Sequence, residues 1–269
     1  MDPLSPILST LDAIRKALDL GGALTQAVQS GVGPLTGLFA RYLVTTVSPS
    51  GGAFTLTSPV AQITPVVQGL AAAALALVVA YLCLRLVMMP APRATLRTGP
   101  AVARLAFAAL LIEFAPIMIQ ACIDASNTVS EVAWRSILEP SWAQILPRLA
   151  YDSRAPYLSA LVVLAAFAAF ITLAAVVVVR YALLGVLVSL SPIAALLALL
   201  PETMWLARLW SALFAAVLVS QPLQVLILGV GFGFDRAFKP PVGHVYALAS
   251  LWVAVKVPAE LARRARRLG

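Results

Sequence analysis

Three long uncharged stretches dominate the second half of this 269-residue chain. Between Arg154 and Asp235 only three residues are charged, and the stretches that they bound are 155–179, 181–201 and 209–234. Each is long enough to cross the hydrocarbon core of a bilayer, which takes about 20 apolar residues of helix. A soluble helix of that length needs a polar stripe facing water, and none is visible here. The sequence therefore predicts an integral membrane protein.

The composition selects a helical membrane fold. Hydrophobic residues make up 61% of the chain and charged residues only 11%, whereas soluble domains carry about 25% charged residues. Outer-membrane barrels are built from alternating segments of roughly ten residues, and the sequence shows no such alternation. We expect an all-α, polytopic helical membrane protein with about five transmembrane helices and an N-terminal amphipathic helical module.

The chain is predicted to have three parts. Residues 1–64 form an external or interfacial module, in which apolar and polar residues alternate at helical spacing over 4–20. Residues 65–239 form the five-span membrane domain, and its external segment is 124–155. Residues 240–269 form an interfacial or re-entrant helix followed by a basic cytoplasmic tail. The five expected spans are 66–88, 101–123, 156–179, 181–200 and 207–234.

The distribution of basic residues predicts the orientation. Arginines crowd the short connection between the first two expected spans and the last few positions of the chain. Cytoplasmic loops carry an excess of Lys and Arg. We therefore expect a multi-pass protein of the cell (inner, cytoplasmic) membrane with its N-terminus outside and its C-terminus in the cytoplasm. The net charge of +8 indicates topology and attraction to anionic lipid, in preference to a nucleic-acid site.

Polar residues within the expected spans are the candidate functional residues. Glu113 lies near the middle of the second span, where a carboxylate is costly and normally faces a bundle interior or a wet cavity. Gln221 and Gln224 flank Pro222 in the last span and can satisfy a freed carbonyl or bond across helices. These three residues either line a conduit or hold helices together. As structural glue, Glu113 would pair with Gln221 or Gln224.

The residues needed for catalysis or for a cofactor are not found together. His244 is the only histidine and has no cysteine or acidic cluster near it in the sequence, so no metal site is predicted. No Ser-His-Asp or Cys-His set can be assembled, and no carboxylate pair suits hydrolysis. Gly229-Val-Gly231-Phe-Gly233 ends an apolar helix and lacks a following lysine, so it does not indicate nucleotide binding. We expect a protein that is not an enzyme and holds no cofactor.

A family pattern runs through residues 180–234. An arginine (Arg180) opens an apolar run, Ser-Pro192 lies near its middle, Leu-Pro201 ends it, and Leu-Trp210 starts the next run. This pattern resembles the TrbL family of polytopic inner-membrane subunits of type IV secretion and conjugation machines. The resemblance covers about 55 residues and matches the family at Arg180, Pro192, Pro201 and Trp210. With the expected spans, Trp210 should lie at the outer interface of the membrane.

The resemblance implies a membrane-embedded structural or channel subunit of a type IV secretion complex that transfers DNA or protein. It further implies other secretion subunits as partners, including a separate ATPase, and transient contact with the translocated DNA or protein. Small residues in the spans suit a homo-oligomer within the lipid bilayer. The alternative is a small secondary transporter or another ion-conducting membrane protein, which would favour paired broken helices in two related halves.

Overall fold

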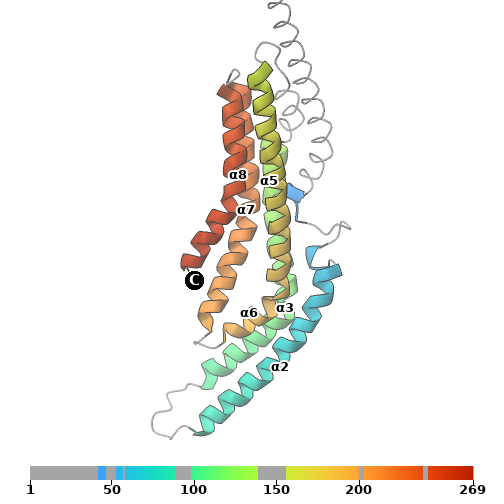
Figure 1. The fold of residues 1–269 in the computed structure, drawn as a ribbon. Helices are drawn as coiled ribbons and strands as arrows, with labels where there is room; N and C mark the ends of the chain where they lie inside the picture. Colours follow the sequence, from blue (N-terminus) through green and yellow to red (C-terminus); the bar gives the residue numbers. More distant parts are fainter. Residues whose placement is uncertain are drawn as a thin grey trace, which may run out of the picture. The chain divides into compact units, whose positions relative to one another are not determined.

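Helices make up nearly all of the chain that the structure, a computed structural model, describes. The described residues are 42–46, 53–56, 58–88, 98–138, 156–199, 203–238 and 242–268. No strand occurs among them (Figure 1). The all-α fold class expected from the composition is confirmed.

Five of the described helices are long and apolar enough to cross a membrane. They are α2 (Ser58–Met88), α3 (Thr98–Ala133), α5 (Pro156–Ser189), α7 (Met204–Ala237) and α8 (Val242–Leu268). The shorter elements are the 3₁₀ helix η1 (Phe54–Leu56), the π-helical turn η2 (Trp134–Leu138) and α6 (Ser191–Leu197). The expected number of spans agrees with this set, but their positions do not all agree.

The third and fourth expected spans are one helix. The sequence predicts a boundary at Arg180, and that boundary is wrong, because α5 continues without interruption to Ser189. Arginine is a good helix former, and the side chain of Arg180 is buried, with 4% of its surface exposed. A single charge therefore does not end the helix here. The chain breaks instead before α6.

The fifth candidate span is α8, where the sequence predicts a short interfacial or re-entrant helix and a separate tail. The structure has one helix of 27 residues there. Residues 124–138, the described part of the external segment expected at 124–155, are also helical, because α3 continues to Ala133 and η2 follows directly. The predicted amphipathic helix at 4–20 lies outside the described residues.

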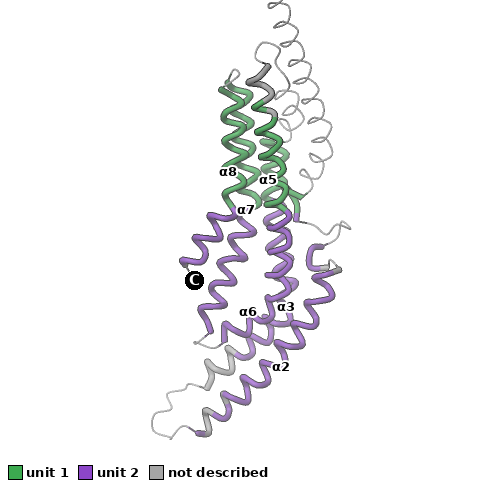
Figure 2. Tube along the Cα trace, viewed as in Figure 1, with its two compact units in different colours: residues 1–45, 129–177, 221–257 green, residues 46–128, 178–220, 258–269 purple. Residues whose placement is uncertain are grey.

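Two compact units divide the chain (Figure 2). Unit 1 comprises residues 1–45, 129–177 and 221–257, and unit 2 comprises residues 46–128, 178–220 and 258–269. Each unit has its own apolar core. In unit 1, Phe170 and Leu173 of α5 pack with Leu228 and Phe232 of α7 and with Leu251 of α8.

The core of unit 2 joins η1 and α2 to three other helices. Phe54 of η1 packs with Ile123 of α3, Leu184 of α5 and Phe214 of α7.

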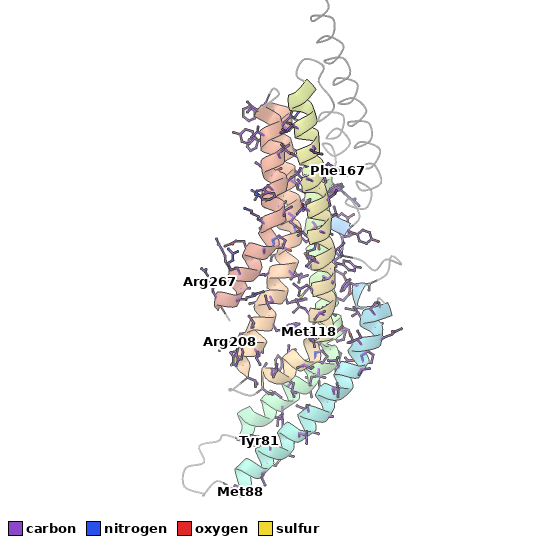
Figure 3. The ribbon with its side chains drawn as sticks, viewed as in Figure 1. Tyr81, Met88, Met118, Phe167, Arg208 and Arg267 are labelled. Carbon is purple, nitrogen blue, oxygen red and sulfur yellow. The ribbon has the colours of Figure 1, made fainter. Side chains whose placement is uncertain are left out.

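Apolar side chains also cover much of the outer surface of α2 and α3, as expected for helices that face lipid. Tyr81 and Met118, labelled in Figure 3, are both more than half exposed.

Prolines inside the long helices leave backbone carbonyls without their usual donor. A proline has no N–H, so the carbonyl four residues before it loses its helical hydrogen bond. In α3, Pro116 frees the carbonyl of Ile112 in this way. Gln68 of α2 donates to that oxygen from its side-chain amide, at 3.3 Å. A neighbouring helix thus supplies the donor that the proline removes.

Two more prolines are served in the same way. Pro222 in α7 frees the carbonyl of Leu218, and the hydroxyl of Ser126 in α3 donates to it at 3.0 Å. Pro258 in α8 frees the carbonyl of Ala254, and the side-chain amide of Gln224 in α7 donates to it at 3.0 Å. The hydrocarbon core offers no water to satisfy such an oxygen, and Ala254 is fully buried, so each donor fixes which helices lie together.

We predict that Gln68 and Pro116 are energetically coupled. Gln68→Leu should destabilise the protein by about 1 kcal/mol, in the range of hydrogen bonds within membranes. Pro116→Ala restores a backbone N–H that can donate to the Ile112 carbonyl, so Gln68→Leu should cost clearly less in that background. Denaturant unfolding of the four proteins in detergent gives the double-mutant cycle. Equal costs in both backgrounds would contradict the coupling.

A second prediction concerns the close approach of α7 and α8 in unit 1. A Cβ added at Gly231 would collide with the Ser250 side chain, whereas one at Gly233 would meet nothing within 4 Å. Alanine is better than glycine in a helix by roughly 0.5–1 kcal/mol, so Gly233→Ala should raise the thermal unfolding temperature. Gly231→Ala should lower it, because overpacking costs about 1–3 kcal/mol. The same upward shift for both variants would rule out the close contact.

Candidate functional site

A row of polar side chains runs along one face of α3 in unit 2. Gln120 follows Glu113 by seven residues and Asp124 follows Gln120 by four. At 3.6 residues per turn these spacings place all three on one side of the helix. We call this row the α3 polar face. It lies in a helix that is long and apolar enough to cross a membrane.

Hydrogen bonds fix the middle of the α3 polar face. The backbone N–H and the hydroxyl of Thr55 in η1 both donate to Oε1 of Gln120, at 3.1 and 3.0 Å. The Gln120 amide then donates to Oδ1 of Asp124 at 2.8 Å. The hydroxyl of Thr128 donates to the backbone carbonyl of Asp124, also at 2.8 Å. This chain of bonds orients Gln120 and holds one oxygen of the Asp124 carboxylate.

Glu113 is exposed on the surface of the described part of the chain. Its neighbours Leu110, Phe114 and Ile117 are exposed as well, by 56%, 48% and 66%. The expectation that Glu113 lies among this chain's own helices is therefore not met. Whether it lines a conduit or meets another subunit stays a prediction.

The two glutamines of α7 are buried in unit 1. Gln221 donates from its side-chain amide to the carbonyl of Val44 at 2.6 Å, and Gln224 donates to that of Ala254. Both amides therefore reach across to other segments, which is one of the two uses expected of them. The carbonyl freed by Pro222 is served by Ser126 instead.

Two residues of the family pattern, Pro192 and Trp210, lie where α5 ends. Pro192 is the second residue of α6, a position where its missing N–H costs no hydrogen bond. The last carbonyls of α5 need other donors: the indole Nε1–H of Trp210 donates to the carbonyl of Leu187 at 3.1 Å, and the Ser191 hydroxyl donates to that of Val188 at 2.7 Å. Pro201 lies outside the described residues.

Several residues of this region were not singled out from the sequence. Gln120, Asp124, Thr55, Gln68 and Ser126 all carry contacts described above. One signal was available for the first two, since a polar residue recurs at helical spacing after Glu113 in an apolar segment. The side chains that donate to freed carbonyls have no such signal, because which of them reaches a carbonyl depends on which helices are neighbours.

The described residues contain no group of three or more His, Cys, Asp or Glu placed to hold a metal ion. His244 and Asp235 form a pair at the α7–α8 connection, with 3.0 Å between Nδ1 and Oδ1. A Cβ at Gly243 would lie 2.9 Å from the Asp235 carbonyl oxygen, so the backbone of α8 approaches α7 closely beside this pair.

Comparisons with protein-family models, with curated proteins and with solved structures found no match to this chain. They therefore add nothing to the resemblance to the TrbL family, which remains a hypothesis based on the sequence pattern.

We predict that Trp210 stabilises unit 2 by two separable contributions. Trp210→Phe keeps a ring that can stack on Phe214, as the indole does at 5.2 Å, but removes the donor to Leu187; it should cost about 1–2 kcal/mol of unfolding free energy. Trp210→Ala removes both and should cost about 3 kcal/mol. Denaturant unfolding in detergent measures the two losses. If the Trp210→Phe variant has the same unfolding free energy as the wild type, the hydrogen bond to Leu187 does not contribute to stability.

Proposed function

We propose that this chain is a membrane-embedded structural or channel subunit of a type IV secretion complex, similar to TrbL-type subunits. The proposal rests on the family pattern at Arg180, Pro192, Pro201 and Trp210 and on the five candidate spans. The observation that carries it is the exposed Glu113 on the α3 polar face. That face requires something other than lipid against it.

The energetic argument starts from the cost of a carboxylate in hydrocarbon. On insertion scales an acidic residue at the centre of a membrane helix costs about 2.5–3.5 kcal/mol. Glu113 is surrounded by exposed apolar side chains, so its position along α3 corresponds to the apolar part of the helix. Either water or another protein surface must cover it for the cost to fall. A subunit of a larger assembly meets that requirement, whereas an isolated lipid-facing helix does not.

The α3 polar face also has a direction. Asp124 follows Glu113 by eleven residues, which is about 16 Å along the helix axis, or roughly half of a hydrocarbon core of about 30 Å. With Glu113 near mid-depth, Asp124 falls at the edge of the membrane and Gln120 lies between them. Polar groups would then extend from the membrane surface to its middle. Such a row suits the wall of a wet conduit between subunits.

The proposed orientation keeps the N-terminus outside and the C-terminus in the cytoplasm. With α2, α3, α5, α7 and α8 as the spans, two groups of arginine fall on the cytoplasmic side: four around the α2–α3 connection and four at the end of α8. Because α5 is one helix, the start of α7 moves to the cytoplasmic side. Trp210 is then proposed at the inner end of its helix, in place of the outer position expected from the sequence.

We predict opposite effects of Glu113→Leu on the isolated subunit and on the assembly. The purified subunit should become more stable or insert better, because an exposed carboxylate is replaced by an apolar side chain. Secretion or conjugative transfer, measured by complementing a deletion strain, should fall by about tenfold or more, the loss expected when an interaction of more than about 1.4 kcal/mol is removed. Glu113→Gln tests whether ionisation is required, and Phe114→Leu, at an exposed neighbour, is the control.

The same deletion strain tests the proposed class. Transfer should be lost in the deletion and restored by the wild-type chain, and a secretion ATPase should co-purify with it. Unimpaired transfer in the deletion strain, together with Glu113-dependent uptake of a solute by proteoliposomes, would instead support a secondary transporter.

A further inference from the structure

The last ten residues of α8 form a strongly basic helical segment in unit 2. It contains Arg263, Arg264, Arg266 and Arg267 and one acidic residue, Glu260. The four arginines are exposed, and Arg267 is labelled in Figure 3. Ala265 is 5% exposed, and it lies two positions from Arg263 and from Arg267, which is roughly 200° around the helix. The segment therefore has a buried side and a basic side.

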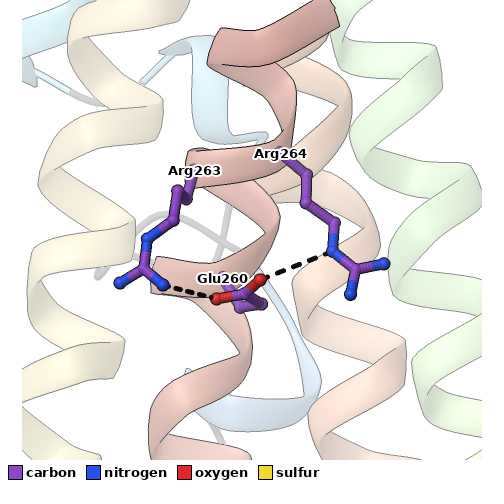
Figure 4. Close-up of polar contacts among 3 residues, drawn as sticks. All are labelled: Glu260, Arg263 and Arg264. Carbon is purple, nitrogen blue, oxygen red and sulfur yellow. Dashed lines mark hydrogen bonds and ion pairs between the residues drawn. The ribbon is translucent and has the colours of Figure 1, made fainter.

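Glu260 organises part of this basic side. Its two carboxylate oxygens lie 3.0 Å from Nη1 of Arg263 and 3.5 Å from Nε of Arg264 (Figure 4). Both guanidinium groups remain largely exposed, with 66% and 74% of the side-chain surface accessible. Arg266 and Arg267 form no ion pair with any residue that the structure describes. One carboxylate thus offsets only a small part of the positive charge.

We propose that residues 259–268 bind the phosphate groups of anionic phospholipids through these four arginines. Guanidinium groups form charge-assisted, often paired hydrogen bonds with phosphate oxygens. A basic segment that directly follows a membrane helix is attracted to anionic headgroups by about 1 kcal/mol per Lys or Arg. The ligand is thus a membrane lipid of the leaflet that receives the end of α8.

The part of α8 before this segment favours lipid over nucleic acid. Residues 242–255 carry no Asp, Glu, Lys or Arg. In unit 1, Trp252 is 54% exposed, and Nζ of Lys256 lies 5.1 Å from the centre of its ring. Tryptophan and lysine at the end of an apolar helix are typical of headgroup depth. The basic segment begins only three residues later in the sequence, so headgroups are its nearest anions.

The test measures lipid binding by the full-length protein in neutral detergent, titrated with short-chain phosphatidylglycerol or short-chain phosphatidylcholine. The wild type should prefer phosphatidylglycerol, and raising the salt from about 0.1 M to about 1 M should weaken the preference. Arg266→Gln with Arg267→Gln should weaken phosphatidylglycerol binding by about fivefold for each arginine removed. Arg135→Gln is the control, since Arg135 is an exposed arginine whose charge is already offset by Glu131, and it should leave binding unchanged.

Glu260→Gln gives an effect in the opposite direction. It removes the carboxylate that competes with phosphate for Arg263 and Arg264, so phosphatidylglycerol binding should become several-fold tighter. This variant also tests the proposal if the double glutamine variant does not fold. Replacing all four arginines by lysine keeps the charge but removes the paired hydrogen bonds, so it should weaken phosphatidylglycerol binding only in part.

Three results would overturn the proposal. One is equal binding of the two lipids by the wild type. Another is unchanged or weaker phosphatidylglycerol binding by Glu260→Gln. The third is that binding of a labelled DNA duplex requires these arginines, whereas binding of either lipid does not. That result would assign the segment to nucleic acid. None of these results depends on whether the chain is a secretion subunit.

Discussion

The arrangement of the helices depends on satisfying backbone carbonyls where no water can do so. In hydrocarbon an unpaired carbonyl costs several kcal/mol, and each proline within a helix creates one. The oxygens freed by Pro116, Pro222 and Pro258 each accept a hydrogen bond from a side chain of another helix. A donor and its oxygen must stay within about 3 Å of each other. Each hydrogen bond therefore fixes the relative position of two helices, which apolar contacts, being non-directional, do not do alone.

The sequence predicted the class of fold but not the ends of its helices. The long uncharged stretches predicted helices that are long and apolar enough to cross a membrane, and the expected number of five agrees because α8 replaces the span that was lost when two expected spans proved to be α5. These stretches were not sufficient to place the ends, because the charge of Arg180 suggested a boundary although a buried arginine can continue a helix. Because the third and fourth expected spans are both part of α5, α7 is the fourth candidate span and α8 is the fifth.

The candidate site was predictable to a similar degree. Glu113, Gln221 and Gln224 stand out in the sequence as polar groups in apolar surroundings. Their partners do not, because a single sequence does not say which helices are neighbours. The glutamines therefore hold packing positions in unit 1, while Glu113 lies on an exposed face of α3. One pattern of polar residues in membrane helices thus covers two different roles.

The order of the proline partners along the chain bears on how the protein is made. In all three pairs the donor comes before the oxygen that it serves: Gln68 precedes Ile112, Ser126 precedes Leu218, and Gln224 precedes Ala254. Synthesis proceeds from the N-terminus, so each donor helix has already left the ribosome when the helix with the freed carbonyl emerges. None of these three carbonyls has to wait for a partner that is still untranslated. The sequence order of these pairs therefore suits insertion one helix at a time.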